Sequence, residues 1–487
     1  MILAAPQAMV KALLRDDLLR RLLRNTSYLL TGTAGASFLA LVALALTARA
    51  LGPELLGILA MIQAYAGMVD RARIETWPAL IKYGAEALEE ERYDDFKGLI
   101  KFGFLVDIAS AAFATMIAVG GVFAAGWWFD WAPETIQMAG LFSISILFRT
   151  SSMPTAVLRL FNRFGLDAVQ DVATNAVRVL LVAIAYMFEA GLWAFLLITL
   201  AAQILNSTVL TIAGWVVLWR EGYRGIMSSS CKGITQRCPG IWGFIWSLNA
   251  GNIARRSTRE LDILFVGAVL DPAAASLYHI AKKLGEILVL AGTPIQQAVY
   301  PELARLWARA EAARFRRTVT QIDLSSGGLG VAFMLVMAFN AELLISLTMG
   351  AQFTAAAGPL VFQTLGVVVF LFGTALRPAL FSMGMQVRFL QIVTLSTVCF
   401  YATLLIAVPS FGIYGAPIAH IIYNLVWLIA MRAAFGEGIR QGPAVAAGAA
   451  LAEEAPSRFG LREGLAAPPE RAPPHPAAGV AGTGDPR

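Results

Sequence analysis

The feature that most constrains this chain is a succession of twelve apolar segments, most of them about 20 residues long. A helix needs about 20 apolar residues to cross the hydrocarbon of a bilayer. The segments are 28–50, 55–81, 99–126, 134–156, 171–188, 192–218, 241–268, 273–298, 319–348, 355–376, 387–408 and 413–431. The sequence therefore predicts an all-α, polytopic membrane protein with twelve transmembrane helices.

Composition agrees with this class. Of 487 residues, 58% are hydrophobic and 14% charged, and the mean hydropathy is +0.66. The net charge of +6 is typical of basic cytoplasmic loops, and a nucleic-acid partner is not expected. Cys231, Cys238 and Cys399 form neither a disulfide framework nor a pattern of zinc ligands.

The distribution of Lys and Arg predicts the orientation in the membrane. With a cytoplasmic N-terminus, every predicted inside loop carries Lys or Arg, and the six outside loops carry none. The outside turns are short, for example 51–54 and 270–273. Both termini are therefore expected in the cytoplasm.

The two halves of the chain are similar to each other. Pro53 recurs as Pro272 and Phe96 as Phe315, each at an offset of 219 residues, and Pro154 recurs as Pro378 at an offset of 224. Two repeats of six helices, related by an axis along the membrane normal, would form two lobes around a central cavity. The predicted organisation is a cytoplasmic amphipathic N-terminus (1–27), a first six-helix lobe (28–219), a cytoplasmic linker (220–240), a second six-helix lobe (241–435) and a disordered cytoplasmic tail (436–487).

Charged residues cluster between Trp242 and Pro301, although this stretch is apolar enough for two membrane helices. Each Arg, Lys or Asp at a helix centre costs about 2.5–3.5 kcal/mol, so the cluster is expected to face water, a partner charge or a ligand. Asn249, Asn252, Arg256 and Arg259 share one helical face. The pattern indicates a basic, water-filled cavity and hence an anionic cargo.

Arginine suits a pyrophosphate because its planar guanidinium offers two parallel donors. The candidate substrate-binding residues are Arg71, Arg73, Arg255, Arg256, Arg259, Lys282, Lys283 and Arg377. Structural pairing is the alternative for several of them: Arg256 with Glu260, Arg259 with Asp262, Lys282 with Glu286, Arg71 with Glu75 and Arg73 with Asp70. Asp171, Asn175 and Arg178 form a further polar stripe that contacts either the sugar or other helices.

Asp70, Asp262 and Glu286 are candidates for coupling transport to an ion gradient, although ordinary ion pairs account for them as well. No nucleophile elbow, phosphate-binding glycine loop or metal-ligand cluster is present in the sequence. The outside turns are also too short for a catalytic domain. No enzymatic activity, catalytic residue, metal or cofactor is expected.

Three segments carry a family resemblance. TSYLLTGTAGASFLALVALALTARALGPELLGILA, STRELDILFVGAVLDPAAASLYHIAKKLGEIL and AVYPELARLWA resemble the oligosaccharide flippase (polysaccharide biosynthesis) branch of the multidrug/oligosaccharidyl-lipid/polysaccharide exporter superfamily, over residues 25–435. Asp271 departs from the branch, in which Gly is expected before the Pro.

The resemblance implies a V-shaped pair of six-helix lobes that flips a polyprenyl-pyrophosphate-linked oligosaccharide across the bacterial inner membrane by alternating access. It implies that Arg49 and the basic residues at 71, 73, 255, 256, 259, 282 and 283 bind the pyrophosphate. The expected partners are the lipid-linked oligosaccharide, membrane lipids and polysaccharide polymerase or assembly proteins.

Two other functions remain open from the sequence. A drug or cation exporter of the same superfamily is disfavoured by the excess of buried Arg and Lys, which would repel a cation. A scaffold subunit of a polysaccharide assembly complex would not require charge at the membrane midplane.

Overall fold

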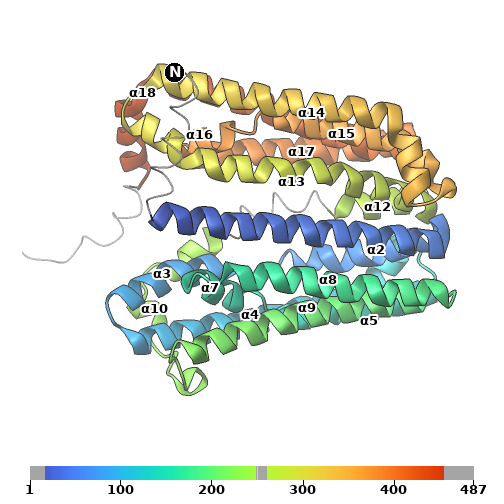
Figure 1. Ribbon diagram of the computed structural model, residues 1–487, viewed down its shortest axis with the longest axis horizontal. Helices are drawn as coiled ribbons and strands as arrows, with labels where there is room; N and C mark the ends of the chain where they lie inside the picture. The colour runs from blue at the N-terminus through green and yellow to red at the C-terminus, as the bar shows by residue number, and fades with distance from the viewer. Residues whose placement is uncertain (1–16, 248, 250–259, 455–487) are drawn as a thin grey trace, which may run out of the picture.

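The computed structural model describes residues 17–247, 249 and 260–454, and the regular secondary structure in these ranges is entirely helical (Figure 1). The first half contains α2 (Asp17–Asp70), α3 (Trp77–Glu89), α4 (Tyr93–Trp128), α5 (Pro133–Ser143), α6 (Ser145–Phe148), α7 (Ser152–Leu160), α8 (Phe164–Met187) and α9 (Leu192–Arg220). Short helices η1 (Ile226–Ser228) and α10 (Ile234–Arg237) follow. The second half contains α12 (Leu261–Val269), α13 (Pro272–Ala308), α14 (Ala312–Thr348), η2 (Ala351–Ala356), α15 (Ala357–Leu371), α16 (Leu376–Ser382), α17 (Gln386–Phe411), η3 (Gly412–Tyr414) and α18 (Gly415–Glu454).

The predicted all-α membrane fold is confirmed. Within the described ranges, eight helical stretches are long and apolar enough to cross a membrane. Two of them, Thr31–Asp70 and Gln386–Gly442, each include two legs joined by a turn. The count of twelve stays a prediction.

Helix α2 reverses direction at Gly52, where φ is 72° and ψ is 177°. Glycine adopts this conformation without a steric penalty, and Pro53 then starts the second leg. The second leg ends at Asp70, so the prediction that this helix continues to residue 81 was wrong. Pro78 stands in the first turn of α3, where its missing N–H breaks no helical hydrogen bond, whereas a continuous helix would have lost one.

The two halves repeat the same series of helix ends. Four non-glycine residues of the first half have a positive φ, and each is matched by a residue with positive φ in the second half, 219–223 residues further along the chain. The pairs are Glu91 with Ala310, Asp130 with Gly350, Asn162 with Gly384, and Glu189 with Gly412. Phe96 and Phe315, which the sequence paired, are both fully buried just after the first of these turns. The internal repeat therefore extends to the positions at which the backbone takes a positive φ.

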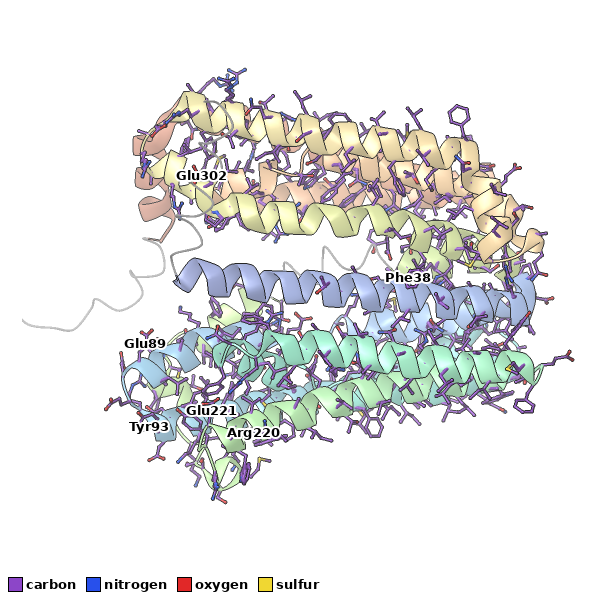
Figure 2. All side chains as sticks on the ribbon, in the orientation of Figure 1. Phe38, Glu89, Tyr93, Arg220, Glu221 and Glu302 are labelled. Atoms are coloured by element: carbon purple, nitrogen blue, oxygen red, sulfur yellow. The ribbon has the colours of Figure 1, made fainter. Side chains whose placement is uncertain are left out.

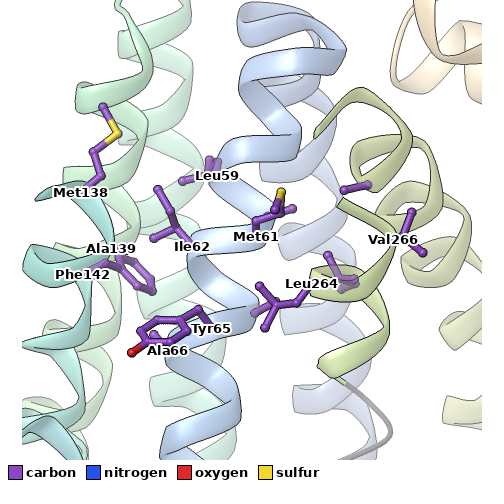
Figure 3. Close-up of a cluster of buried hydrophobic side chains, with 14 of the residues drawn as sticks. Leu59, Met61, Ile62, Tyr65, Ala66, Met138, Ala139, Phe142, Leu264 and Val266 are labelled. Carbon is purple, nitrogen blue, oxygen red and sulfur yellow. The ribbon is translucent and has the colours of Figure 1, made fainter. Parts of the chain in front are cut away.

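Each half has its own hydrophobic cluster, and two clusters join the halves: a smaller one, with Ala48 and Leu56 against Ile280 and Leu284, and a larger one, called the joining cluster here. Tyr83, Phe96 and Met153 belong to the first-half cluster, whereas Trp307 and Phe315 belong to the second-half cluster. The joining cluster brings the second leg of α2 against α5 on one side and α12 on the other (Figure 3). Its side chains include Met61 and Tyr65 from α2, Phe142 from α5, and Leu264 and Val266 from α12. The halves therefore share a core near the turns at Gly52 and Pro272.

The opposite end of the molecule is rich in charge. Figure 2 labels Glu89, Arg220 and Glu221 at this end of the first half and Glu302 at the same end of the second half. The predicted linker also lies here, and Ile226, Ile234 and Cys238 pack into the first-half cluster. Ile241 and Ile245, predicted to start the second lobe, join the same first-half cluster.

Helix α18 continues to Glu454, with a change of direction at Gly442. The predicted disordered tail, 436–487, therefore begins with helix as far as Glu454, and this part of the prediction was wrong. Residues 444–452 read AVAAGAALA, and alanine has the highest helix propensity. The rest of the predicted tail and most of the predicted N-terminal segment, residues 1–16, lie outside the described residues.

Gly57 tests the contact between the halves. A Cβ added there would lie 1.7 Å from the carbonyl oxygen of Pro272, which is backbone and cannot rotate away. Gly57→Ala should therefore destabilise the protein by about 1–3 kcal/mol, despite the better helix propensity of alanine. Thermal unfolding in detergent measures the effect. Gly120→Ala is the control, because nothing lies within 4 Å of a Cβ there, and an equal loss of stability in both variants would contradict the contact.

Candidate functional site

A cavity of about 320 Å³ lies between the two halves. Its walls come from both legs of α2, from α8 and from α13, so residues far apart in sequence share one space. The lining residues are Ser37, Ala40, Leu41, Leu44, Thr47, Leu56, Leu59, Ala60, Gln63, Arg178, His279, Lys283, Glu286 and Ile287. The wall is therefore largely apolar, with a few polar and charged groups.

Arg178 of α8 is the most informative of these groups. Its Nε is buried, and no hydrogen bond or ion pair to the side chain is formed within residues 17–247, 249 and 260–454. An uncompensated guanidinium at this depth is costly, and arginine cannot escape the cost by losing its proton. The side chain is thus ready to bind an anion that enters the cavity.

The second half contributes a charged pair to the same cavity. Lys283 Nζ lies 3.1 Å from Glu286 Oε2, and both side chains remain partly exposed. Among the lining residues, Arg178 and Lys283 are cationic and only Glu286 is anionic, which leaves one positive charge. The cavity is therefore electrostatically suited to an anionic group.

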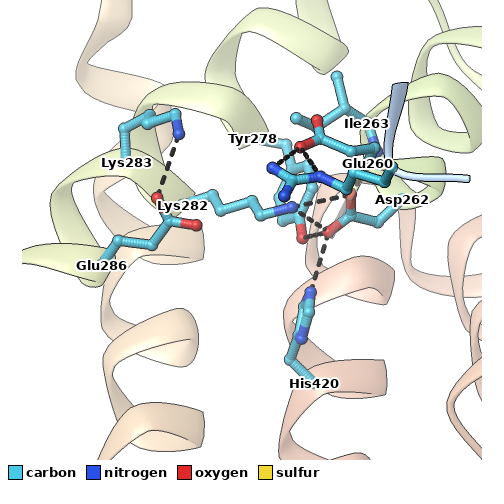
Figure 4. Close-up of polar contacts among 9 residues, drawn as sticks. Glu260, Asp262, Ile263, Tyr278, Lys282, Lys283, Glu286 and His420 are labelled. Atoms are coloured by element: carbon cyan, nitrogen blue, oxygen red, sulfur yellow. Dashed lines mark hydrogen bonds and ion pairs between the residues drawn. The ribbon is translucent and has the colours of Figure 1, made fainter. Parts of the chain in front are cut away.

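A second polar cluster lies beside the cavity but is closed to ligands (Figure 4). The Asp262 carboxylate, at 0% exposure, accepts from Lys282 Nζ at 2.9 and 2.7 Å and from the Tyr278 hydroxyl at 2.5 Å. His420 Nε2 lies 2.9 Å from Asp262 Oδ2, and the Ile263 N–H donates at 2.8 Å. Both carboxylate oxygens are occupied, so the cluster connects α12, α13 and α18 rather than offering a ligand to a cation.

This cluster changes the interpretation of two predicted residues. Lys282 was a candidate for substrate binding and Asp262 for ion coupling, but the structure pairs them with each other in the core. The sequence analysis gave Glu286 as the alternative partner of Lys282. In the structure Glu286 forms an ion pair with the next residue of α13, Lys283. The sequence analysis missed His420 altogether, although a histidine inside a predicted membrane helix is an available signal.

The charges at the end of α2 are likewise paired. Nε and Nη2 of Arg71 donate to one oxygen of Glu260 at 2.9 and 2.6 Å, which links the two halves. The predicted pairing of Arg71 with Glu75 needs a helix, and the helix ends at Asp70. The predicted pairing of Arg73 with Asp70 is confirmed at 2.6 Å, and Arg149 joins the same carboxylate at 2.9 Å.

The remaining predicted cations are dispersed. Arg377 stacks on Phe381 and Phe389, with its guanidinium carbon 5.4 and 5.6 Å from the ring centres. Arg49 donates to the carbonyl oxygens of Thr348, at 3.0 Å, and Leu347 at the end of α14, where a cation is favoured by the helix dipole. Arg255, Arg256 and Arg259 lie outside the described residues, so their role stays a prediction.

In each half, one apolar helical stretch is interrupted, between α6 and α7 in the first half and between α15 and α16 in the second. A buried aspartate that the sequence analysis missed binds the backbone at each interruption. Asp107 of α4 accepts the N–H of Met153 at 3.0 Å, at the start of α7. Asp323 of α14 accepts the N–H of Ala375 at 2.8 Å, at the start of α16. Each helix start has N–H groups without helical partners, and a carboxylate satisfies them best.

An arginine completes each of these breaks. Arg73 Nη1 donates to the carbonyl oxygen of Arg149 at 2.5 Å, and Arg432 Nη2 donates to that of Phe372 at 2.8 Å. Arg73 is therefore engaged twice by the protein and is not available to a ligand in this conformation. Of the described residues proposed from sequence for substrate binding, Lys283 is the one that lines the cavity.

The pairing of Lys282 with Asp262 predicts a specific stability pattern. Lys282→Met should destabilise the protein strongly, by about 3–5 kcal/mol, because it leaves a buried carboxylate without its cation. Combining it with Asp262→Asn should recover most of the loss, since the remaining groups are neutral. Thermal unfolding of the two single variants and the double variant measures this. A stable, inactive Lys282→Met would instead support a direct role in cargo binding.

Comparisons with known proteins agree with this architecture. Residues 22–307 match a family model described as "Polysaccharide biosynthesis protein". The chain is 26% identical over 351 residues to the inner membrane protein YghQ of Escherichia coli (strain K12), covering 71% of this chain and 98% of that one.

Two solved transporter structures are similar in fold. The lipid II flippase MurJ in an inward closed conformation has a TM-score of 0.63 at 12% identity, covering 88% of this chain and 92% of that one. An inward-facing multidrug resistance MATE family transporter of the MOP superfamily has a TM-score of 0.61 at 13% identity, covering 85% and 96%.

Proposed function

The chain belongs to the polysaccharide biosynthesis protein family, and from this premise we propose that it moves a polyprenyl-pyrophosphate-linked oligosaccharide across the inner membrane. In this proposal the glycan is handed on to polysaccharide polymerase or assembly proteins. The transporter fold shared with MurJ and the MATE protein supports transport as the activity.

Arg178 carries the proposal. It is a guanidinium without a protein partner among the described residues, in a cavity whose lining charges sum to one positive charge. A pyrophosphate offers negatively charged acceptors to Arg178, while Lys283, which is paired with Glu286, lines the same cavity from α13. A cationic drug would meet repulsion at the same point, which disfavours the exporter alternative.

The contacts between the halves support alternating access. At the Gly52 end, Arg49 of the first half holds the end of α14, and Met61 packs against Leu264. Beyond the end of α2, Arg71 and Glu260 form a further link between the halves. The buried clusters that belong to one half each would stay intact if the contacts of α2 with α12 and α13 parted, so the cavity could open to the outside without either half unfolding.

Arg178→Ala should lower the rate of transport about tenfold to a hundredfold, because a hydrogen bond to a charged group contributes about 1.5–3 kcal/mol. The assay follows a fluorescent polyprenyl-pyrophosphate glycan between the leaflets of proteoliposomes. Arg178→Lys should retain part of the rate, since it keeps the charge but not the planar donor pair.

Arg163→Ala is the matched control, because Arg163 precedes the same helix but is half exposed and bonded to Glu221. Normal transport by a folded Arg178→Ala variant would refute the assignment of the site. Transport of cationic drugs, but not of the glycan, by the wild-type protein would establish the exporter instead.

The proposed orientation places both termini and the charged end of the molecule in the cytoplasm. Cys231 is partly exposed in the segment between α9 and α10, whereas Cys238 is buried, and burial raises the pKa of its thiol. A membrane-impermeant maleimide should therefore label a Cys238→Ala/Cys399→Ala variant only after the cells are permeabilised. Glu54→Cys in the same background, at an outside turn, should be labelled in intact cells. The reverse pattern would invert the topology.

A further inference from the structure

Some polar groups of the cavity already have hydrogen-bond partners in the described part of the protein, and others do not. On the first-half wall, Ser37, Gln63 and Arg178 have no hydrogen-bond partner among the residues that the structure describes. On the second-half wall, Lys283 is already bonded to Glu286. The groups available to a ligand therefore come from α2 and α8. Of the two neutral ones, Gln63 can form the most hydrogen bonds, because its amide has two N–H donors and a carbonyl acceptor whereas the Ser37 hydroxyl has a single donor.

Gln63 is placed where an unbonded amide is unfavourable. It lies on the second leg of α2 in a wall that is otherwise made of Leu56, Leu59 and Ala60. The side chain is half buried, yet neither of its polar atoms is among the fully buried atoms that lack a partner, so both are accessible from the cavity. An amide in an apolar surrounding costs about 1–3 kcal/mol on the scale of protein mutations unless a partner binds it. A partner that supplies both an acceptor and a donor fits best.

A phosphate does not fit that description, because at neutral pH it presents mainly acceptors. A sugar hydroxyl does, since it donates one hydrogen bond and accepts two. The volume restricts which sugar this is. At about 320 Å³ the cavity is at the lower end of ordinary ligand pockets, about 300–1,000 Å³, and accommodates a headgroup rather than a whole oligosaccharide.

We propose that Gln63 is a specificity-determining residue that hydrogen-bonds the sugar attached directly to the phosphate, while Arg178 holds the phosphate itself. This inference rests on the proposed function. It adds which part of the cargo the protein recognises, namely the first sugar. A site built to hydrogen-bond a substrate group discriminates strongly against an analogue that lacks the group. The distal sugars, which do not enter the cavity, contribute little to selection.

Binding of two probes to the full-length protein in nanodiscs tests the proposal. One probe is polyprenyl pyrophosphate without sugar, and the other carries a single monosaccharide on the pyrophosphate. The wild-type protein should bind the sugar-bearing probe at least about tenfold more tightly. Gln63→Leu should remove this preference and leave the affinity for the sugar-free probe within about twofold, whereas Arg178→Ala should weaken both.

Gln63→Asn is a second variant, which keeps the amide but withdraws it by one methylene, and it should reduce the preference in part. Gln391→Leu, at an exposed position of α17, is the matched control and should behave like the wild-type protein. Equal binding of both probes by the wild-type protein, or an equal loss for both probes in folded Gln63→Leu, would overturn the inference. Failure of the wild-type protein to bind either probe would instead remove the proposed function, and the inference with it.

Discussion

The buried ion pair between Asp262 and Lys282 is the interaction around which the two halves are arranged. A carboxylate at 0% exposure is stable at this depth only with a cation and further donors, and it has both from α13 and α18. These bonds fix the start of α12, and with it the neighbouring Glu260 that reaches Arg71 on the other half. This one neutralised charge thereby positions three helices of the second half, together with the ion pair between Glu260 and Arg71 that follows the end of α2. It also explains why so apolar a chain retains charge at this point.

The same physical requirement operates at the helix breaks. A break inside a membrane helix exposes N–H and C=O groups that lipid cannot satisfy. Both halves solve the problem with a buried aspartate for the N–H groups and an arginine for a carbonyl, although Arg73 comes from the segment between α2 and α3 and Arg432 from α18. Much of the buried charge in this protein therefore supports the backbone. Arg178, in contrast, has no hydrogen bond or ion pair among the described residues, and it lines the cavity between the halves.

The sequence predicted the helical membrane fold and the internal repeat, because apolar length and recurring prolines are local properties. It did not predict which charges are paired. Arg71 has an acidic neighbour at helical spacing in Glu75, yet its partner is Glu260, since the helix ends at Asp70, before both residues of the predicted pair. Lys282 and Lys283 are adjacent and chemically alike, but a rotation of about 100° along α13 directs one into the core and the other into the cavity. Arg178 was recognised as part of a polar stripe, but its lack of a partner depends on what surrounds it in three dimensions.

The matched turns carry an implication for the conformational stability of the two halves. At three of the four paired positions the second half has glycine, whereas the first half has Asp130, Asn162 and Glu189, all at positive φ. A non-glycine residue at positive φ costs about 1–2 kcal/mol, and the cost is smallest for asparagine and aspartate. At these three positions the first half thus carries a backbone penalty that glycine avoids in the second half, whereas at the fourth both halves carry it, at Glu91 and Ala310. Each half provides a tested template for redesigning the other, and glycines copied across the repeat offer a rational route to a more robust protein for experiment.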